Sequence, residues 1–543
     1  MLELVSDILV VLGLSVFAWR RSLQYLRFLQ QEEYDTGRFL RWLRQYRFYD
    51  RKATLTLAIA AAALSFVAHG AAFTLAIVVL AMGALLAIAF RERDPRRQGK
   101  ITLKMTERAK RIHQTATALT VAVIIFAVWA SNALPGAHGV VAMFLFAIAV
   151  VQLLPVLLCG AVLLLEPAEQ QRKRQFLTEA KEKYRRVAPY TVGITGSYGK
   201  TSTKAILGKV LETALGPTFW PVKGINTEMG ITREIRERLT DSHQWAVIEM
   251  GAYRRGSIAR LCELTPPNAA IVTAVGLMHL DRMGSADNVL LAKSELAQAV
   301  PADGVLVCNG DNDGAREIAK RHPKQTTLLY GLEPERGGLA CWADEITFKL
   351  GGTHFRIHWG GRTYPAFSPL HGRPALSNVL GAFAMAASLG GDPEYVIASF
   401  RSLQPVNNRL EVVAQPGYVQ INDAYNSNPV GFAAALEVLK SLPGERKILV
   451  TPGMIELGEE QFAENARIGR LAASCCDLAF VVGSVNREAL AAGLKEGGLA
   501  EEAIRFFDNR DGALEALAQL RQAGDVVLLE NDLPDLYELD IRL

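Results

Sequence analysis

The sequence predicts a multidomain protein with an N-terminal α-helical transmembrane bundle, followed by a P-loop α/β domain and a C-terminal Rossmann-like α/β domain. Three observations support this fold class. Long uncharged apolar runs are concentrated in about the first 165 residues, a glycine-rich loop begins at residue 193, and strand and helix patterns alternate after it. A chain of 543 residues has room for about three or four domains.

Apolar stretches in the first part of the chain are long enough to cross a membrane. A spanning helix needs about 20 mostly apolar residues. Four stretches qualify with help from their flanks: Ala53–Ala68, Ala71–Phe90, Thr115–Ala130 and Val140–Leu165. A fifth, Leu4–Trp19, is shorter and contains an aspartate, so we predict four to five spans.

Positive charge is distributed unevenly around these stretches. Nine Lys or Arg residues lie within 20–52, nine within 91–112 and seven within 167–190, whereas the turns at 69–71 and 132–138 have none. Basic loops stay on the cytoplasmic side of a membrane. We therefore expect a multi-pass membrane protein whose two basic loops and whole C-terminal part are cytoplasmic.

The first basic loop, residues 20–52, carries several aromatic side chains among its arginines. This mixture is typical of an amphipathic helix at the membrane interface. Two roles remain open for the loop. It either attaches to anionic lipid head groups or forms a docking surface for a lipid-linked phosphate substrate.

Composition excludes some partners and sites. The net charge is only +4, and the basic residues lie beside the apolar runs, so no nucleic-acid partner is expected. The six cysteines have neither metal-type nor disulfide-type spacing, which favours reduced cytosolic thiols. They are Cys159, Cys262, Cys308, Cys341, Cys475 and Cys476.

A phosphate-binding loop is the most informative motif of the chain. The run Gly193–Lys204 follows a short apolar segment and precedes a helix with one apolar face. Glycines at 196 and 199 allow a tight turn whose N–H groups point toward phosphate oxygens. Lys200 adds a positive charge at the helix N-terminus, and the Thr201 hydroxyl suits Mg²⁺. We expect this loop to bind a nucleoside triphosphate.

Further polar residues follow predicted strands, where chemistry collects in parallel α/β sheets. Glu249 ends the strand Trp245–Glu249 and suits a metal, while His279 lies just beyond the strand predicted at Ala269–Val275. Asp423 similarly ends a strand in the last part of the chain. These positions predict one site at strand ends in each α/β domain.

We divide the chain into four parts. Residues 1–166 form the transmembrane region, 167–189 a basic linker, 190–404 the P-loop domain and 405–543 the Rossmann-like domain.

Together these blocks resemble the Mur ligase family, ATP-dependent amide-bond ligases of bacterial cell-wall precursor synthesis. Within it they are most similar to the branch that adds D-alanyl-D-alanine to a UDP-linked muramoyl tripeptide. The resemblance covers about 190–543. Its motifs are Gly193–Ser202, Asn226–Gly230, Glu249–Ala252, His279 with Lys293 fourteen residues later, Asn309–Asp313, Asn408–Leu410, Asp423–Pro429 and Gly453–Gly458.

The resemblance implies ATP and Mg²⁺ as cofactors and assigns roles to matching positions. It implies phosphate-loop contacts from Gly196, Ser197, Gly199, Lys200, Thr201 and Ser202, and metal contacts from Thr201, Glu249, His279 and Lys293, the last as a carbamate. It implies further nucleotide contacts from Asn378, Arg409 and Asp423, and substrate contacts from Asn226, Thr227, Tyr425, Asn426 and Asn428. The implied catalytic residues are Lys200, His279, Lys293 and Arg409.

The chain also departs from the family pattern. The family usually has a His-Asn pair where this chain has Pro374 and Ala375, and a histidine where it has Asn465. The family's N-terminal UDP-binding domain has no counterpart here, because membrane spans occupy its place. A soluble UDP-linked substrate therefore does not follow from the resemblance.

These features predict a membrane-anchored, ATP-dependent carboxylate–amine ligase of the bacterial inner membrane. Its acceptor would be a lipid-linked or membrane-proximal cell-envelope precursor, and its amine an amino acid or short peptide. A homo-oligomer or a membrane complex is compatible with this prediction. The alternatives are a synthetase of the poly-γ-glutamate type and an inactive nucleotide-binding scaffold at the membrane.

Overall fold

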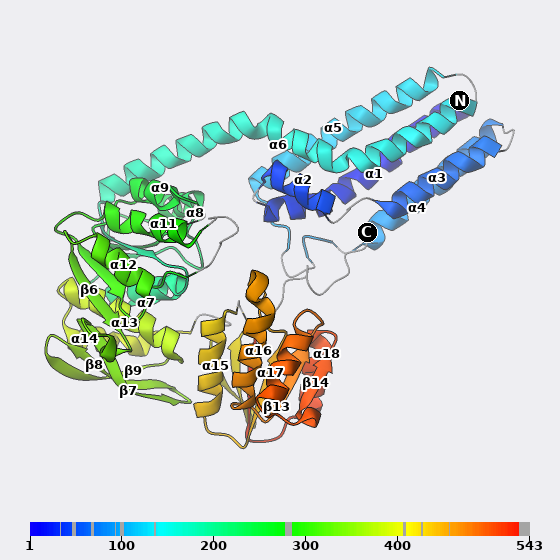
Figure 1. Cartoon of the computed structure of the whole chain (residues 1–543). Helices are drawn as coiled ribbons and strands as arrows, with labels where there is room; N and C mark the ends of the chain where they lie inside the picture. The colour runs from blue at the N-terminus through cyan, green and yellow to red at the C-terminus, as the bar shows by residue number, and fades with distance from the viewer. Residues whose placement is uncertain are drawn as a thin grey trace. The chain divides into compact units, whose positions relative to one another are not determined.

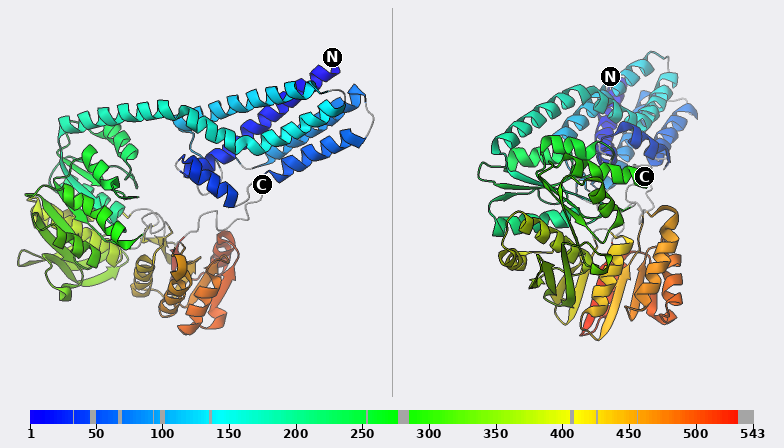
Figure 2. Two further views of the ribbon diagram at one scale, coloured as in Figure 1. Left: turned by 45° about the horizontal axis from the view of Figure 1, so that its top comes forward. Right: turned by 60° about the vertical axis from the view of Figure 1, so that its left-hand side comes forward.

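The structure is a computed structural model that describes residues 1–32, 34–45, 50–66, 70–92, 94–97, 102–134, 137–252, 254–276, 285–405, 409–424, 427–455 and 457–531. The chain divides into a helical unit, Met1–Lys173, and an α/β unit that begins at Arg174. The colour ramp of Figures 1 and 2 separates the blue and cyan helices of the first from the green-to-red strands and helices of the second.

The helical unit contains six helices among the described residues, and all of them except α2 contain most or all of a predicted apolar stretch. They are α1 (Leu2–Gln31), α2 (Thr36–Gln45), α3 (Arg51–Phe66), α4 (Ala71–Arg91), α5 (Glu107–Asn132) and α6 (Ala137–Val187). Four of them, α1, α4, α5 and α6, are long and apolar enough to cross a membrane, by length and composition. The stretch predicted at Leu4–Trp19 lies in α1, one of these four, whereas α3 has only 16 residues, or about 24 Å.

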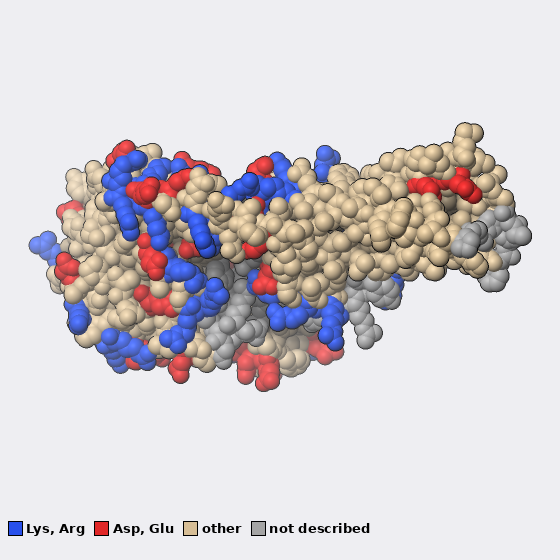
Figure 3. Space-filling model, turned by 90° about the horizontal axis from the view of Figure 1, so that it is seen from above, with Lys and Arg blue, Asp and Glu red and all other residues tan. Residues whose placement is uncertain are grey.

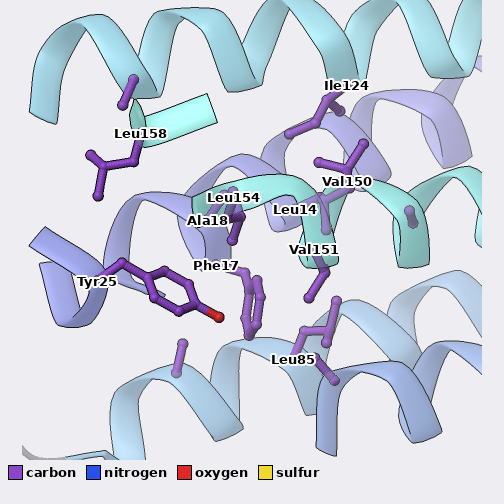
Figure 4. Close-up of a cluster of buried hydrophobic side chains, with 14 of the residues drawn as sticks. Leu14, Phe17, Ala18, Tyr25, Leu85, Ile124, Val150, Val151, Leu154 and Leu158 are labelled. Atoms are coloured by element: carbon purple, nitrogen blue, oxygen red, sulfur yellow. The ribbon is translucent and has the colours of Figure 1, made fainter. Parts of the chain in front are cut away.

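Apolar side chains from all six helices form the interior of the helical unit. Leu14 and Phe17 of α1 lie in one cluster with Leu85 of α4, Ile124 of α5 and Val151 of α6, and all five are buried (Figure 4). The helices therefore bury one stripe each against their neighbours. Large apolar residues on the other faces, such as Leu80 and Trp129 among those described, stay exposed.

Charged groups join the helix ends on the basic side of this unit. The Arg21 guanidinium lies 2.7 Å from Asp50 Oδ2 and 2.7 Å from Glu92 Oε2, and the Arg21 and Asp50 side chains have no exposed surface. Asp50 Oδ1 also accepts a hydrogen bond from Ala53 N (2.9 Å) at the start of α3. This network connects α1, α3 and the residue after α4.

The α/β unit contains two sheets. The first has the order β2-β3-β1-β4-β5-β6-β7-β8-β9, and the second has the order β10-β11-β15-β12-β13-β14. The first sheet consists of β1 (Tyr190–Thr195), β2 (Thr218–Phe219), β3 (Trp245–Glu249), β4 (Ala269–Val272), β5 (Val305–Asn309), β6 (Thr326–Gly331), β7 (Cys341–Lys349), β8 (Gly352–Trp359) and β9 (Arg362–Ser368). The second consists of β10 (Glu411–Gln415), β11 (Tyr418–Asp423), β12 (Arg446–Thr451), β13 (Leu478–Val482), β14 (Ile504–Phe507) and β15 (Asp525–Glu530).

Both sheets contain antiparallel pairs in addition to the parallel strands that the sequence predicts. The strands β7, β8 and β9 pair antiparallel, as do β10 and β11. The turn between β8 and β9 is Gly360-Gly361, with positive φ at both residues, which is the geometry of a two-residue hairpin. The parallel part of the first sheet, from β2 to β7, holds the predicted strand end at Glu249, and Asp423 lies at the end of β11 in the second sheet.

Helices cover both faces of the first sheet. Successive residues of β3 show this, because Val247 belongs to the apolar cluster of α7 and α13 whereas Ala246 and Ile248 belong to that of α8, α9 and α11. The helices of the unit are α7 (Lys200–Ala214), α8 (Glu228–Arg238), α9 (Ser257–Leu264), α11 (Ala286–Ala299), α12 (Asp313–Arg321), α13 (Arg373–Ser388), α14 (Pro393–Ser399), α15 (Pro429–Ser441), α16 (Gln461–Ala473), α17 (Arg487–Glu496) and α18 (Arg510–Leu520).

The six cysteines are buried free thiols. Burial raises the pKa of the Cys262 thiol to about 12, so this thiol stays protonated and unreactive at neutral pH.

Candidate active site

The glycine-rich loop turns between β1 and α7 as the sequence predicts. Gly199 has φ of 80°, and α7 begins at the next residue, Lys200. A side chain at Gly199 would come within 2.5 Å of Asn378 Oδ1, and one at Gly196 would collide with Thr273 Oγ1. Both glycines are therefore required by close approach of neighbouring elements.

Lys200 lies over this loop. Its Nζ donates to the carbonyl oxygens of Gly196 (2.6 Å) and Ser197 (3.1 Å). Burial lowers the pKa of Lys200, although the nearby Glu249 carboxylate partly offsets this effect. The ammonium group is thus held at the mouth of a turn built to receive phosphate oxygens.

Glu249, at the end of β3, is surrounded by three donors. Its Oε1 accepts from Thr201 Oγ1 (3.0 Å) and Asn226 Nδ2 (3.0 Å), and its Oε2 accepts from Lys204 Nζ (3.0 Å). The Glu249 and Lys204 side chains are each 1% exposed. The Thr201 hydroxyl and the Glu249 carboxylate are hard oxygen donors side by side, so this pair fits Mg²⁺.

Lys204 was missed from the sequence, although it follows Lys200 by one helical turn. Its ammonium group also donates to the Lys223 carbonyl oxygen. Burial lowers the pKa of Lys204, and the Glu249 charge opposes that effect. The sequence signal that could have identified it is a second lysine four residues after the first, within the run Gly199–Lys204.

Lys293, on α11, is only 5% exposed. Burial and the charge of Lys200 lower its pKa to about 7. A large fraction of the amine is therefore neutral at physiological pH, which is the form that reacts with CO2 to give a carbamate. His279, its predicted metal-binding partner, lies outside the described residues.

Asn378 packs against the phosphate loop from α13. Its Oδ1 accepts from Thr203 Oγ1 (3.0 Å), and the residue is buried. Pro374 occupies the first turn of α13, where a missing N–H costs nothing. Its neighbour Ala375 lines a cavity together with Ser202 of α7.

The second sheet places Asp423 at the end of β11. Its Oδ1 accepts from Leu410 N (3.0 Å), and burial raises the pKa of Asp423 to about 6 although Arg409 opposes this shift. Glu530 is paired with Asp423 in the register of β15 and was missed from the sequence. Burial and the Asp423 charge raise the pKa of Glu530 well above its ordinary value.

The predicted substrate residues have local roles among the described residues. Thr227 caps α8 by accepting from Gly230 N (3.3 Å), and Asn428 caps α15 by accepting from Gly431 N (3.0 Å). Asn226 binds Glu249, as described above. Tyr425 and Asn426 lie outside the described residues.

Ser197 Oγ donates to the Gly276 carbonyl oxygen (2.9 Å), which holds the phosphate loop against the segment after β4.

The sequence outside the helical unit matches two known domains. Residues 194–386 match the Mur ligase middle domain, and residues 408–530 match the Mur ligase glutamate ligase domain. A UDP-N-acetylmuramoyl-tripeptide–D-alanyl-D-alanine ligase of Mycobacterium tuberculosis (strain CDC 1551 / Oshkosh) is 32% identical over 362 residues, which cover 62% of this chain and 69% of that protein. The chain belongs to the Mur ligase family.

Other Mur ligases are similar at lower identity. The ligase of the same name from Bacillus subtilis (strain 168) is 28% identical over 62% of this chain and 72% of its own length. Two solved structures superpose with a TM-score of 0.58 and 26% identity over 66% of this chain: MurF from Acinetobacter baumannii, of which 76% is covered, and MurF ligase from Thermotoga maritima in complex with ADP, of which 80% is covered.

The Mur ligase matches begin at residue 194, so the helical unit lies outside both of them.

One departure from the family pattern has a visible local basis. Asn465, which stands where the family has a histidine, is fully buried and its Oδ1 accepts from Met454 N (2.8 Å) while its Nδ2 donates to Met454 O (3.0 Å). This side chain fixes the loop after β12.

Proposed function

We propose that this chain is a membrane-anchored, ATP-dependent carboxylate–amine ligase that works through an acyl phosphate. The observation that carries the proposal is that Thr201 and Lys204 of α7 both contact the Glu249 carboxylate, beside the glycine-rich loop whose carbonyl oxygens bind Lys200. Family membership supports it, since the relatives are named as ligases of a muramoyl tripeptide and D-alanyl-D-alanine. A structure of one relative contains ADP.

Two bond exchanges make up the reaction. A carboxylate oxygen of the acceptor attacks the γ-phosphorus of ATP, the bond to the β–γ bridging oxygen breaks, and ADP leaves. The amine nitrogen then attacks the carbonyl carbon of the acyl phosphate, phosphate leaves, and the nitrogen loses a proton. Both reactants of the first step are anions, so positive charge must be held where they meet.

The residues around the loop supply that charge. Lys200, with its Nζ beside the Gly196 carbonyl, is positioned to bind the transferred phosphoryl group, and backbone N–H groups at the start of α7 bind the other phosphates. Thr201 and Glu249 would hold Mg²⁺, which when bound neutralises phosphate charge. Lys204 fixes the Glu249 carboxylate in place through a 3.0 Å ion pair.

Lys293 would act as a carbamate. The pKa of Lys293 is low, its side chain is buried, and it has no hydrogen bond or ion pair with the described residues. These properties suit a side chain that is to be modified by CO2. The carbamate would convert a buried cation into an oxygen ligand for a second metal.

The helical unit would place this chemistry at the membrane. Asn132 Nδ2 donates to Asp7 Oδ2 (2.8 Å), which puts the start of α1 at the same end of the bundle as the uncharged turn between α5 and α6. The Arg21 network lies fourteen residues further along α1, or about 21 Å away. Figure 3 shows a long stretch of surface on the helical unit without Lys or Arg. We infer that the basic end faces the cytoplasm and that the acceptor is lipid-linked or membrane-proximal.

Phosphate release tests the ligase. The detergent-solubilised full chain would be given ATP, Mg²⁺, membrane lipid extracts and pools of L- and D-amino acids and dipeptides. We expect release that requires both an acceptor fraction and an amine, and a loss of about 10²–10³-fold in Lys200→Ala. Lys320→Ala, an exposed lysine of α12, is the matched control. ATP binding without stimulated release by any pool would favour the inactive scaffold.

A further inference from the structure

Glu530, at the end of β15, is a buried acid that the proposed reaction does not involve. The residue is 1% exposed, and it stands beside Asp423 in the register of β11 and β15. Its Oε1 accepts from Ser427 Oγ (2.6 Å), whereas its Oε2 has no hydrogen-bond donor among the described residues. A hydrogen bond joins the carboxyl groups of Glu530 and Asp423.

This hydrogen bond requires a proton. Two carboxylates can only accept, so one of the two groups must be a carboxylic acid. Asp423 is the better carboxylate, because its Oδ1 accepts from Leu410 N (3.0 Å) and the Arg409 charge opposes the rise that burial causes in its pKa. Glu530, enclosed and next to the Asp423 charge, is therefore the acid, and its Oε2 donates the proton. Asp423 and Arg409 are the ionisable groups, among those described, that act on this pair.

Asp423 holds a strained part of the backbone. Leu410, whose N–H it binds, has φ of 48°, a left-handed conformation that leucine rarely adopts. The Leu410 side chain lies against the start of α13, where a Cβ added at Gly372 would come within 2.4 Å of it. Such a conformation persists only where its surroundings enforce it. The Asp423 carboxylate is thus a support of the turn formed by Arg409 and Leu410.

The same turn places Arg409 near the phosphate loop. Arg409 lines a cavity together with Ser202 of α7. Burial lowers the pKa values of Lys200 and Lys204, and the Arg409 charge lowers both further. Cations gathered in this way repel one another, and a triphosphate between them would relieve the repulsion. A guanidinium suits that role, because its planar fork binds two phosphate oxygens at once.

We propose that Glu530 is a positioning residue for nucleotide binding, which as a carboxylic acid orients Asp423, supports the turn at Leu410 and so directs Arg409 toward the triphosphate. This inference rests on the proposed function, because ATP is the ligand, and it adds a condition to ATP binding. One proton must stay between the two acids. When Glu530 loses that proton, the two carboxylates repel each other and Asp423 loses a donor, so ATP binding weakens as pH rises.

Isothermal titration of the detergent-solubilised full chain with ATP and Mg²⁺, between about pH 6.5 and 9.5, tests the need for the proton. The wild-type affinity should fall as Glu530 ionises. Glu530→Gln should keep its affinity, because an amide group can donate to Asp423 at any pH. The ratio of the two affinities should change about tenfold, and other titrating groups affect both chains alike. Glu515→Gln, exposed on α18, is the matched control and should follow the wild type.

A double-mutant cycle tests whether Glu530 acts through Arg409. At neutral pH, Glu530→Leu removes the donor and should weaken ATP binding about tenfold. Arg409→Ala should weaken it about ten- to a hundredfold, because a charged phosphate contact is lost. In the Arg409→Ala chain, the further change Glu530→Leu should have little effect, since the residue that the acid pair positions is already gone.

Two results would overturn the inference. One is a parallel pH dependence of ATP binding in the wild type and Glu530→Gln, a comparison that holds even where Glu530→Leu fails to fold. The other is additive losses in the double variant, which would show that Glu530 does not act through Arg409. Neither result bears on acceptor-stimulated phosphate release. The expected pH dependence of ATP binding in a chain without such release would contradict the proposed function alone.

Discussion

Glu249 and Asp423 are both buried strand-end acids of the α/β unit, yet their surroundings are opposite. Glu249 faces an ammonium group, a hydroxyl and an amide, all donors within 3.0 Å. Asp423 faces Glu530, a second acid whose pKa is raised well above its ordinary value. The first site is built for a bound cation and the second for a retained proton, so position at a strand end does not by itself define chemistry.

Glu249→Gln tests the first half of this comparison and should have the largest effect. Activity should fall by at least about 10²–10³-fold, because the anionic oxygen beside Thr201 is lost. The free energy of unfolding should fall by about 3–5 kcal/mol, because Lys204 is left buried without its partner charge. Phosphate release and thermal unfolding midpoints measure the two effects.

The double variant Glu249→Gln with Lys204→Met separates these effects. Removal of the orphaned ammonium should restore most of the stability, whereas activity should stay lost. Restored activity in the double variant would show that Glu249 acts only by pairing with Lys204.

Substitution of Lys293 should lower the activity nearly as much. We expect Lys293→Ala to lower the rate about 10²-fold, and Lys293→Arg to do the same, since a guanidinium cannot form a carbamate. Wild-type activity should rise as pH passes through about 7 and should fall when CO2 is removed from the buffer. A rate independent of dissolved CO2 would contradict the carbamate.

Lys293 also links stability to pH. Its folded pKa of about 7 lies below the unfolded value of about 10.4, so the unfolded chain binds more protons in this range. Its contribution to stability should therefore rise with pH between about 7 and 10. Lys293→Met should remove that slope, as measured by chemical denaturation at several pH values.

Glu530→Gln tests the second half of the comparison. Its effect on the free energy of unfolding should be opposite in sign to that of Glu249→Gln. Raised carboxyl pKa values mean that the folded chain binds more protons, so stability is full near pH 4 and falls as pH rises through the folded value, about 6 for Asp423. The variant should gain about 1–3 kcal/mol over wild type at pH 8 and little at pH 4.

Glu502→Gln, an exposed glutamate, is the matched control for that experiment and should show no such dependence. A destabilised Glu530→Gln chain at pH 8 would mean that the buried charge has a favourable partner after all.

Ser427→Ala should have the smallest effect. Ser427 Oγ donates to Glu530 Oε1 at 2.6 Å, and its removal leaves that buried oxygen unsatisfied. We expect a loss of about 1–2 kcal/mol in the free energy of unfolding and a further rise in the pKa of Glu530, both measurable by denaturation across pH. Unchanged stability would indicate that water replaces the hydroxyl.

Local patterns made part of this architecture predictable. The glycine-rich loop and the strand ending at Glu249 follow from short-range rules, because turn chemistry and apolar runs are properties of neighbouring residues. The antiparallel strands were missed, although Gly360-Gly361 was a hairpin signal.

Partners of the site residues were harder to find. Lys204 looks like a solvated helix residue, and Glu530 lies more than a hundred residues after Asp423. The fold is therefore needed to show that Lys204 meets the predicted metal residue Glu249 and that Glu530 meets the predicted nucleotide residue Asp423.

The buried cysteines have a practical consequence for testing the proposed membrane orientation. Since every native thiol is enclosed, the surface of the folded chain is silent toward membrane-impermeant thiol reagents. A single cysteine introduced at Asn132, beside the uncharged turn, or at Arg96, on the basic side, would then report sidedness in intact cells without prior removal of native cysteines. Labelling of the first position alone would place the start of α1 outside the cell and the ligase domains within it.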